Sequence, residues 1–298
     1  MLGGAYGPWM RHAILGAGAV GGLLGAALAR SGAEVVLLLR PRSLARYRGF
    51  IAVESEVLGR FEAKVPGITV LDRDVDVVWI TPKSTELEAA LALAPADAVK
   101  AARVIPLMNG VDHMAVLRAR FERVLAGSIR VASVRGADGR ILQPSAFIKM
   151  DLAGDGAHAV AAEVFAAGVD CGVSADETTL LWQKLAFLAP LALATTAADA
   201  PLGVIRHDSI YTRAQAEVLA VALAQGALID LAALEAQRAA APDTMRSSLQ
   251  HDVEQGRIPE LDAIAGPVLR AGREHSLATP AIEDLVGQVR ARAASATS

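Results

Sequence analysis

The 298-residue sequence has a single cysteine, few aromatic residues (4%) and a formal net charge of only −3. One cysteine excludes an internal disulfide and a zinc site built on several cysteines. No cationic or histidine residue stands beside Cys171, which argues against a catalytic thiol. Without a global positive field, we expect neither nucleic acid nor a membrane surface as a partner. We expect a cytoplasmic protein, because nothing in the cysteine usage points to an oxidising compartment.

Long hydrophobic runs are also missing. The stretch 13–29 is uncharged, but it is shorter than the roughly 20 residues that span a bilayer, and it holds five glycines. The stretch 185–198 is shorter still and contains Pro190. Both stretches are therefore expected to be buried elements rather than membrane spans. The six histidines are scattered without the spacing of a metal site, so no metal is predicted.

The first half of the chain alternates short apolar runs with helical segments, which predicts βαβ units and a mostly parallel sheet. Strands are expected over 13–15, 34–39, 50–53, 60–65, 75–80 and 104–108. Helices are expected over 22–31, ending at Gly32, and over 85–93. The segment 124–150 is expected to be β-rich, with a turn at Asp138-Gly139.

The pattern changes near residue 171, after which apolar residues follow helical spacing. Helices are expected over 178–198, 209–239, 244–256, 258–275 and 280–293. The sequence thus predicts an α/β domain over 1–172 and an all-α domain over 173–298. The Ala/Leu faces within 214–236 could serve a homodimer interface or the internal core.

A glycine-rich loop follows the first expected strand: Gly16, Ala17, Gly18, Ala19, Val20 and Gly21. It matches G-x-G-x-x-G between a strand and a helix, with a second strand within about 30 residues, which is the context of a dinucleotide-binding site. Gly16 would permit a tight turn, Gly18 would let the backbone approach a pyrophosphate, and Gly21 would let helix and strand pack closely. The helix N-terminus would then face the phosphates. The alternative is a flexible glycine linker.

The end of the second strand indicates which dinucleotide binds. NAD-specific loops usually carry Asp or Glu there, whereas this sequence has Arg40, followed by Arg42 and Ser43. Guanidinium groups can bind the 2′-phosphate of NADP with charge-assisted hydrogen bonds. NADP is therefore the predicted cofactor, and a solvated basic turn is the alternative interpretation.

Taken in order, these residues and several later ones resemble the ketopantoate reductase (2-dehydropantoate 2-reductase) family over nearly the whole chain. Besides the glycine loop and Arg40, the resemblance rests on Lys83 in Ile80-Thr81-Pro82-Lys83, Asn109-Gly110-Val111, Trp182-Gln183-Lys184-Leu185, the segment 247–252, Pro259-Glu260-Leu261-Asp262 and Ala278-Thr279-Pro280. The family implies a Rossmann domain followed by an all-helical domain, with the active site in the cleft between them. It also implies NADPH-dependent reduction of a keto acid, with a homodimer as the expected assembly by analogy.

The resemblance assigns roles to individual residues. Lys184 falls at the position of the family's catalytic lysine. Glu260 would bind a substrate hydroxyl and orient Lys184, and Ser248 would bind the substrate carboxylate. Asn109 would lie near nicotinamide and substrate, and Lys83 would face the cofactor.

The chemistry agrees with these roles, although each residue also has an ordinary interpretation. Hydride addition to a ketone builds negative charge on oxygen, so a proton donor must be aimed at that atom. Lys184 stands in an otherwise apolar helical stretch, where a lysine either reaches solvent or points into a cleft. Taken alone, Glu260 is an acid in the first turn of a helix, Ser248 a helix serine and Asn109 part of a turn.

One departure from the family affects the substrate. The lysine helix of the family normally carries two asparagines, one and two turns after the lysine, and here these positions are Leu188 and Ala192. Three hypotheses remain: reduction of ketopantoate, reduction of a bulkier or more apolar ketone, and an NADP-binding sensor or regulatory protein without turnover. The presence of both Lys184 and Glu260 argues against the sensor, since a binder needs neither.

Overall fold

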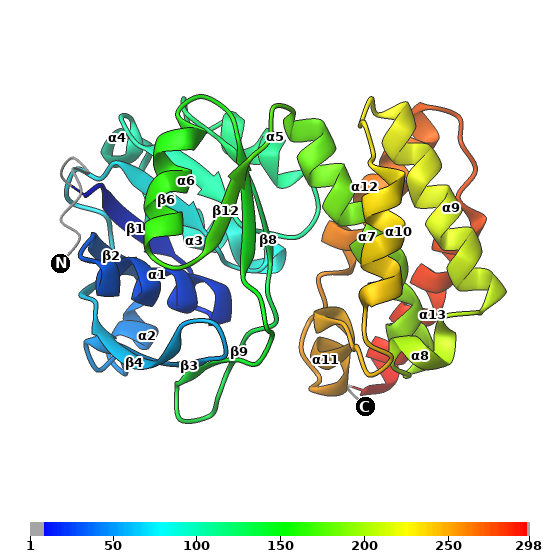
Figure 1. Ribbon diagram of the computed structural model, residues 1–298, viewed down its shortest axis with the longest axis horizontal. Coiled ribbons are helices and arrows are strands. Elements are labelled where there is room, and N and C mark those ends of the chain that lie inside the picture. The colour runs from blue at the N-terminus through cyan, green and yellow to red at the C-terminus, as the bar shows by residue number, and fades with distance from the viewer. Residues whose placement is uncertain (1–8, 297–298) are drawn as a thin grey trace. The chain divides into compact units, whose positions relative to one another are not determined.

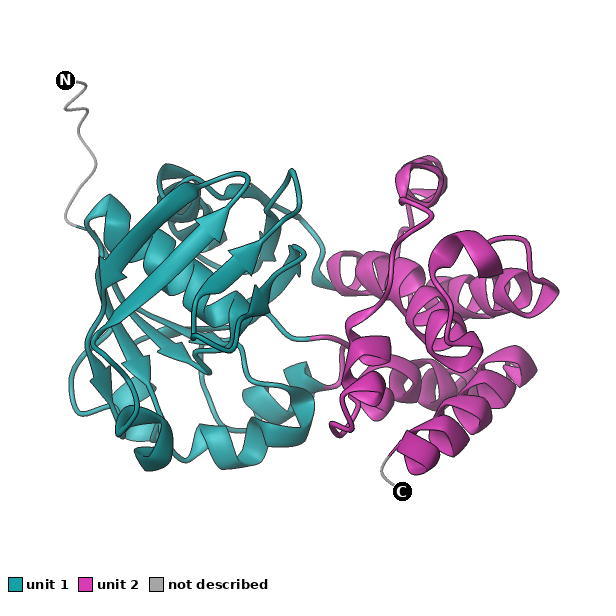
Figure 2. Ribbon diagram, turned by 90° about the horizontal axis from the view of Figure 1, so that it is seen from below, with its two compact units in different colours: residues 1–108, 113–177 teal, residues 109–112, 178–298 magenta. Residues whose placement is uncertain are grey.

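The computed structural model describes residues 9–296, which divide into two compact units (Figure 2). Unit 1 comprises residues up to Met108 together with His113–Glu177, and unit 2 comprises Asn109–Asp112 together with the residues from Thr178 onward. The sequence-based boundary at 172/173 lies a few residues before the end of unit 1. Unit 2 also includes the four residues Asn109–Asp112 from the first half of the chain.

A parallel sheet forms the centre of unit 1 (Figure 1). Its strands, in spatial order, are β5 (Gly67–Ile68), β2 (Glu34–Leu38), β1 (Arg11–Leu15), β6 (Val77–Ile80) and β7 (Arg103–Pro106). Alternate residues face opposite sides, and both sides are buried: Ile14 and Trp79 belong to one core cluster, and Leu15 and Ile80 to another. Such burial on both faces explains the unbroken apolar runs of these strands.

Two smaller sheets complete unit 1. The first has the order β4 (Gly59–Lys64), β3 (Phe50–Ser55), β10 (Ile141–Gln143) and β9 (Val134–Arg135), and the second has the order β12 (Asp170–Val173), β11 (Lys149–Ala153) and β8 (Ala126–Arg130). Strands β9 and β10 pair antiparallel, and Gly139 in their turn has φ +85°. The hairpin predicted at Asp138-Gly139 thus connects them.

The helices of unit 1 are mostly short. They are α1 (Ala19–Ser31), α2 (Pro41–Leu44), the 3-10 turn η1 (Ser84–Glu86), α3 (Leu87–Leu91), α4 (Ala96–Val99), α5 (His113–Arg118) and α6 (Ala157–Ala166). The helix expected over 85–93 is a 3-10 turn followed by little more than one α-helical turn. Helix α6, which the sequence analysis did not predict, packs its buried Val160 and Val164 into the same core as α1.

Within its described residues, unit 2 contains helices joined by loops and no strand. Its helices are α7 (Glu177–Ala198, whose first residue belongs to unit 1), α8 (Leu202–Ile205), α9 (Ser209–Ala224), α10 (Leu231–Ala240), α11 (Ser248–Glu254), α12 (Leu261–Glu274) and α13 (Pro280–Ala296). The α/β unit followed by a helical unit confirms the predicted fold class.

One predicted helix in unit 2 is wrong. The segment 209–239 forms two helices, because Gly226 takes a left-handed conformation (φ +82°) and ends α9. Asp230 then begins α10 as its N-cap, accepting a hydrogen bond from Ala233 N at 2.9 Å. A similar cap delays α11: Ser247 accepts from Gln250 N at 3.1 Å, so this helix starts at Ser248 rather than near residue 244.

Helix α7 is the apolar centre of unit 2. By length and composition it could cross a membrane, but 72% of its most apolar window is buried inside the protein. Its buried residues, including Leu185 and Leu193, pack with α9, α12 and α13 in one core cluster, and the internal Pro190 is buried as well. This burial is typical of a core helix, and the helix continues through the proline to Ala198.

Candidate functional site

The glycine loop of unit 1 joins β1 to α1 and takes its shape from the backbone. Gly16 has φ +97°, and a Cβ atom there would lie 2.6 Å from Pro82 N. At Gly21 a Cβ would overlap both the carbonyl oxygen of Gly16 and the hydroxyl of Thr81. Any larger residue at these two positions would therefore have to push the loop away from the segment that follows β6.

Gly18 differs from its neighbours, because a Cβ atom there would meet no protein atom within 4 Å. It is also the N-cap of α1, with no side-chain cap and no acidic residue in the first turn. The first N–H groups of a helix carry partial positive charge and bind phosphates when nothing else caps them. The loop therefore fits the pyrophosphate of a dinucleotide.

Two residues outside the glycine motif hold this loop. Thr81 Oγ1 donates to the carbonyl oxygens of Gly16 at 2.5 Å and Leu15 at 3.0 Å. Arg135, in β9, donates from Nη1 to Ala17 O at 2.8 Å. From the sequence, Thr81 was named only as part of Ile80-Thr81-Pro82-Lys83, and Arg135 lies too far along the chain for any local pattern to connect it with the loop.

Arg40 is the N-cap residue of α2 and is half exposed. Its guanidinium forms an ion pair with Glu86 at 2.6 Å, and the two side chains are 50% and 47% exposed. Arg42 and Ser43 follow on α2 and are also exposed. Lys83 precedes η1 and is half-buried. All of these residues belong to unit 1.

Unit 2 contains Asn109, Lys184, Ser248 and Glu260. Glu260, just before α12, is 9% exposed, and its Oε2 lies 3.5 Å from Asn109 Nδ2. Gly110 makes this approach feasible: it has φ +82°, and a Cβ atom there would overlap the carbonyl oxygen of Ala263 in α12. The backbone around Asn109 thus packs directly on the first turn of the helix that Glu260 precedes.

Lys184 is half-buried near the middle of α7. Residues three and four positions away share its helix face, and all four are apolar: Leu180, Leu181, Phe187 and Leu188. Lys184 therefore stands on a largely apolar stretch of the surface of α7. Ser248 is the exposed first residue of α11, so its hydroxyl is open to solvent.

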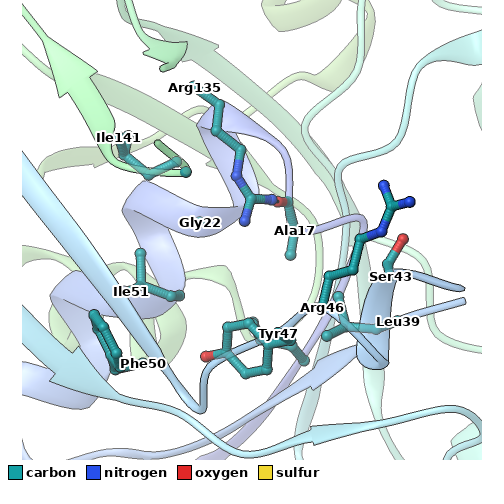
Figure 3. Close-up of a pocket in the computed structure, with 12 residues that line it drawn as sticks. Ala17, Gly22, Leu39, Ser43, Arg46, Tyr47, Phe50, Ile51, Arg135 and Ile141 are labelled. Carbon is teal, nitrogen blue, oxygen red and sulfur yellow. The ribbon is translucent and has the colours of Figure 1, made fainter. Parts of the chain in front are cut away.

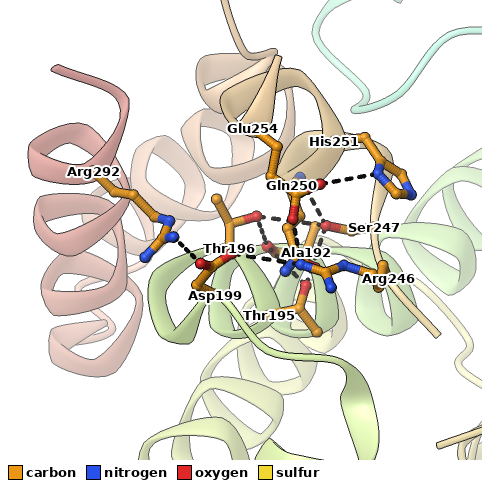
Figure 4. Close-up of polar contacts among 10 residues, drawn as sticks. All are labelled: Ala192, Thr195, Thr196, Asp199, Arg246, Ser247, Gln250, His251, Glu254 and Arg292. Atoms are coloured by element: carbon orange, nitrogen blue, oxygen red, sulfur yellow. Dashed lines mark hydrogen bonds and ion pairs between the residues drawn. The ribbon is translucent and has the colours of Figure 1, made fainter. Parts of the chain in front are cut away.

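The two positions that depart from the family pattern differ in environment. Leu188 is half-buried against the core of unit 2, whereas Ala192 is fully buried. A polar cluster lies next to Ala192 (Figure 4): Thr196 Oγ1 donates to Ala192 O at 2.6 Å, and Thr195 Oγ1 donates to Ser247 Oγ at 3.1 Å. Within residues 9–296, the side-chain amide of the fully buried Gln250 in this cluster has no hydrogen-bond partner.

Among the described residues, no group of three or more His, Cys, Asp or Glu side chains could hold a metal ion. Cys171, in β12, is half-buried, and its pKa is raised to about 12 by burial and then by the charges of Asp151 and Asp170. A thiol with such a pKa remains protonated at neutral pH and is a poor nucleophile.

The chain matches two family models: "Ketopantoate reductase PanE/ApbA" over residues 12–150 and "Ketopantoate reductase PanE/ApbA C terminal" over residues 176–293. It is 31% identical to a 2-dehydropantoate 2-reductase from Caulobacter vibrioides, over 94% of this chain and 98% of that protein. A 2-dehydropantoate 2-reductase from Halobacterium salinarum is 28% identical over the same shares.

Among solved structures, a PanE/ApbA family ketopantoate reductase from Ralstonia eutropha superimposes with a TM-score of 0.87 at 28% identity, over 97% of this chain and all of the other. The family models that match the two halves of the sequence and the comparison of the whole fold therefore point to the same family. The chain belongs to the ketopantoate reductase family and is an NADP-dependent oxidoreductase that acts on CH–OH groups.

Proposed function

We propose that the protein reduces the ketone of a 2-keto acid, ketopantoate or a more apolar relative, with Lys184 as the general acid. The observation that carries the proposal is a lysine on an apolar face of α7, in a chain that also has an uncapped glycine loop for NADP. A sensor would need the loop but not the lysine.

NADPH supplies the hydride when it is bound. Hydride addition to a carbonyl carbon leaves negative charge on the carbonyl oxygen, and Lys184 stabilises this charge and then transfers a proton to the oxygen. The neighbours of Lys184 on its helix face, Leu181 and Leu188 among them, are apolar, and surroundings of low polarity strengthen the interaction of an ammonium group with the developing charge.

The remaining residues of unit 2 position the substrate. Glu260 accepts a hydrogen bond from a substrate hydroxyl, and Asn109, whose amide lies 3.5 Å from it, keeps this carboxylate in place. Ser248, exposed at the start of α11, binds the substrate carboxylate through its hydroxyl. Lys83 contributes to cofactor binding from unit 1.

Leu188 and Ala192 distinguish the two substrate candidates. Amide side chains at these positions would add polar contacts to a hydroxylated substrate, each worth about 1 kcal/mol. Their replacement by apolar side chains favours a substrate with a larger apolar part. Ketopantoate reduction would place the protein in pantothenate biosynthesis, and we propose the cytoplasm as its compartment.

A matched pair of substrates tests this proposal. Ketopantoate and 3,3-dimethyl-2-oxobutanoate differ only in the terminal hydroxyl, so the ratio of their kcat/KM values, measured by NADPH oxidation, reports on that group. If Glu260 binds the hydroxyl, ketopantoate is preferred about tenfold or more, and Glu260→Ala removes the preference. If the apolar side chains of Leu188 and Ala192 determine the preference instead, 3,3-dimethyl-2-oxobutanoate is the better substrate. Leu188→Asn then shifts the ratio of kcat/KM values toward ketopantoate. NADPH binding without turnover of any 2-keto acid would favour the sensor.

We also propose a homodimer. Within the segment 214–236, Ala214 and Val221 are internal core, but Leu223, Leu228 and Leu231 are 51%, 80% and 52% exposed. Side chains of this size are commonly covered by a partner when they gather on one surface. Size-exclusion chromatography with light scattering tests the dimer, and a mass equal to one chain would contradict it.

A further inference from the structure

The segment 109–112 joins two stretches of unit 1 but is itself part of unit 2. Its first residue, Asn109, has its side-chain nitrogen 3.5 Å from Glu260 Oε2. Val111 is half-buried and packs against the helical core. The position of Asn109 beside Glu260 therefore depends on how this short segment is attached to the helices of unit 2, and to α12 in particular.

The first turns of α12 receive the backbone of the segment. Pro267 has no N–H, so α12 cannot make the usual hydrogen bond from position 267 to Ala263 O. Gly110 lies against this carbonyl group: it has φ +82°, and a Cβ atom there would overlap Ala263 O. A residue with a side chain at position 110 would therefore push the segment away from the helix.

Arg270 of α12 holds the other end of the segment. Its Nε donates to Asp112 Oδ2 at 3.0 Å, and its Nη2 donates to the same oxygen. Its Nη1 donates to Asp262 Oδ1, also at 3.0 Å. The hydrogen bond to Asp262, and after it the one to Asp112, raise the pKa of Arg270 against the effect of burial. The guanidinium thus joins a carboxylate of the segment to a carboxylate of the helix.

A glycine makes room for this arrangement. Residues 262, 266 and 270 are spaced four positions apart, so they share one face of α12. A Cβ atom on Gly266 would overlap Nη2 of Arg270 and would lie 2.5 Å from Oδ1 of Asp262. Because position 266 has no side chain, the guanidinium can lie across the helix surface and reach Asp112.

Arg270 is not arranged to bind a ligand itself. Arg46 and Arg135 line a pocket of about 220 Å³ beside the glycine loop, where none of the described lining residues is acidic (Figure 3). In contrast, all three nitrogens of the Arg270 guanidinium donate to Asp112 or Asp262. Such an arginine orients the groups that it joins.

The exposure of the pair also favours a role in orientation. Arg270 and Asp112 are 46% and 50% exposed, and ion pairs at such positions usually add little to the stability of a fold. The geometry is nevertheless specific, because two N–H groups of a planar fork converge on one carboxylate oxygen. The pair is thus better suited to fixing the direction of a short segment than to holding the helices together.

We propose that Arg270 is a positioning residue for substrate binding: it holds Asp112 on α12 and thereby keeps Asn109 beside Glu260. The proposal rests on the proposed role of Asn109 and Glu260 in binding a 2-keto acid. It explains how a segment of four residues can present Asn109 at a fixed place, and it requires no contact between Arg270 and the substrate.

A charge swap tests the proposal in the intact protein. Arg270→Asp brings a third carboxylate to Asp112 and Asp262, so we expect KM for the 2-keto acid to rise about tenfold while kcat changes little. The lysine that donates the proton lies on α7 and is not displaced. Asp112→Arg combined with Arg270→Asp again places an arginine between carboxylates and should recover most of the affinity. Arg270→Gln, which adds no carboxylate, should raise KM by a smaller factor.

Arg273→Gln is the matched control, because Arg273 lies three residues later on α12 and is exposed. It should leave KM and kcat unchanged. Hydrogen exchange of the peptide that contains residues 109–112, followed by mass spectrometry, provides a second measurement without substrate. Exchange should be faster in Arg270→Asp than in the unchanged protein, and slow again in the double variant.

An unchanged KM in Arg270→Asp, or a double variant that recovers neither KM nor slow exchange, would overturn the proposal. A fall in kcat as large as the rise in KM would also overturn it, because the damage would then reach beyond substrate binding. Absence of turnover of any 2-keto acid by the unchanged protein would instead contradict the proposed function. Hydrogen exchange would in that case still decide whether Arg270 holds the segment.

Discussion

The cofactor loop of unit 1 and the lysine helix of unit 2 are built in different ways. Backbone geometry shapes the loop: Gly16 is in a left-handed conformation, and Gly21 has no room for a methyl group. The helix α7 continues from Glu177 to Ala198 with Pro190 inside it, and its chemical character depends on which side chains it carries. Few residue types can replace those in the loop, whereas the helix accepts many sequences.

This difference explains why the two regions carry different information about function. A loop that only glycine can form identifies the class of cofactor, since its steric requirements do not change with the substrate. A helix face can carry Leu188 in place of asparagine without loss of fold, and we propose that the preferred substrate changes with it. The first region therefore indicates the chemistry, and we propose that the second selects which ketone is reduced.

The largest effect is expected at Lys184. Lys184→Met should lower kcat/KM for the preferred 2-keto acid by about 10²–10⁴, because no proton donor then meets the developing oxyanion. The affinity for NADPH, measured by calorimetry, should change little, because the glycine loop lies in unit 1. Gln183→Met, one residue earlier on the same helix, is the control and should keep most of the activity. A fully active Lys184→Met variant would show that Lys184 is not the general acid.

Two glycine substitutions separate fold from cofactor binding within the loop. Gly21→Ala places a methyl group against Gly16 O and Thr81, so we expect about 1–3 kcal/mol of destabilisation in urea unfolding. Gly18→Ala meets no protein atom within 4 Å, so its effect on unfolding should be smaller while NADPH affinity falls. Equal destabilisation by both variants would mean that the loop is not shaped as described.

A smaller effect is expected in the polar cluster next to α7. The amide of Gln250 is fully buried and lacks a partner within residues 9–296. Gln250→Leu should therefore stabilise the protein by about 1 kcal/mol, seen as a higher midpoint of urea unfolding. Gln250→Ala should destabilise it by leaving a cavity. If Gln250→Leu instead lowered the stability, the amide would have a partner that holds α11 to α7.

The smallest effect is expected at Cys171. Its thiol has a pKa raised to about 12, mainly by burial, so almost no thiolate is present at pH 8. Reaction of the folded protein with a thiol-specific disulfide reagent at pH 8 should be slow, and unfolding in guanidinium should release one reactive thiol. Rapid reaction of the folded protein would show that β12 opens readily.

The sequence predicted much of the fold because its signals were local. Gly32 ends α1 in a left-handed conformation, and the apolar run 35–38 is buried on both faces of the sheet, as its composition indicated. The break at Gly226 was missed because apolar spacing continues on both sides of it. The short α2 at Pro41 was missed because one turn of helix carries too little periodicity to be seen.

The candidate site was only partly predictable, for a similar reason. The glycine loop is a contiguous motif, but Arg135 contacts Ala17 across 118 positions of sequence, and only the folded sheet brings them together. The pairing of Arg40 with Glu86 likewise joins residues from different loops of the sheet edge. Asn109 and Glu260 are 151 positions apart, and only the family resemblance suggested that both act on one substrate.

Transfer of deuterium tests most directly the claim that the protein reduces a 2-keto acid by hydride transfer from NADPH. The protein is incubated with a 2-keto acid and NADPH deuterated on either face of C4 of the nicotinamide, and the product is analysed by mass spectrometry and NMR. We expect a 2-hydroxy acid with one deuterium on C2 from only one of the two labelled cofactors, and far less of this product with Lys184→Met. Oxidation of NADPH without deuterium in a 2-hydroxy acid would contradict it.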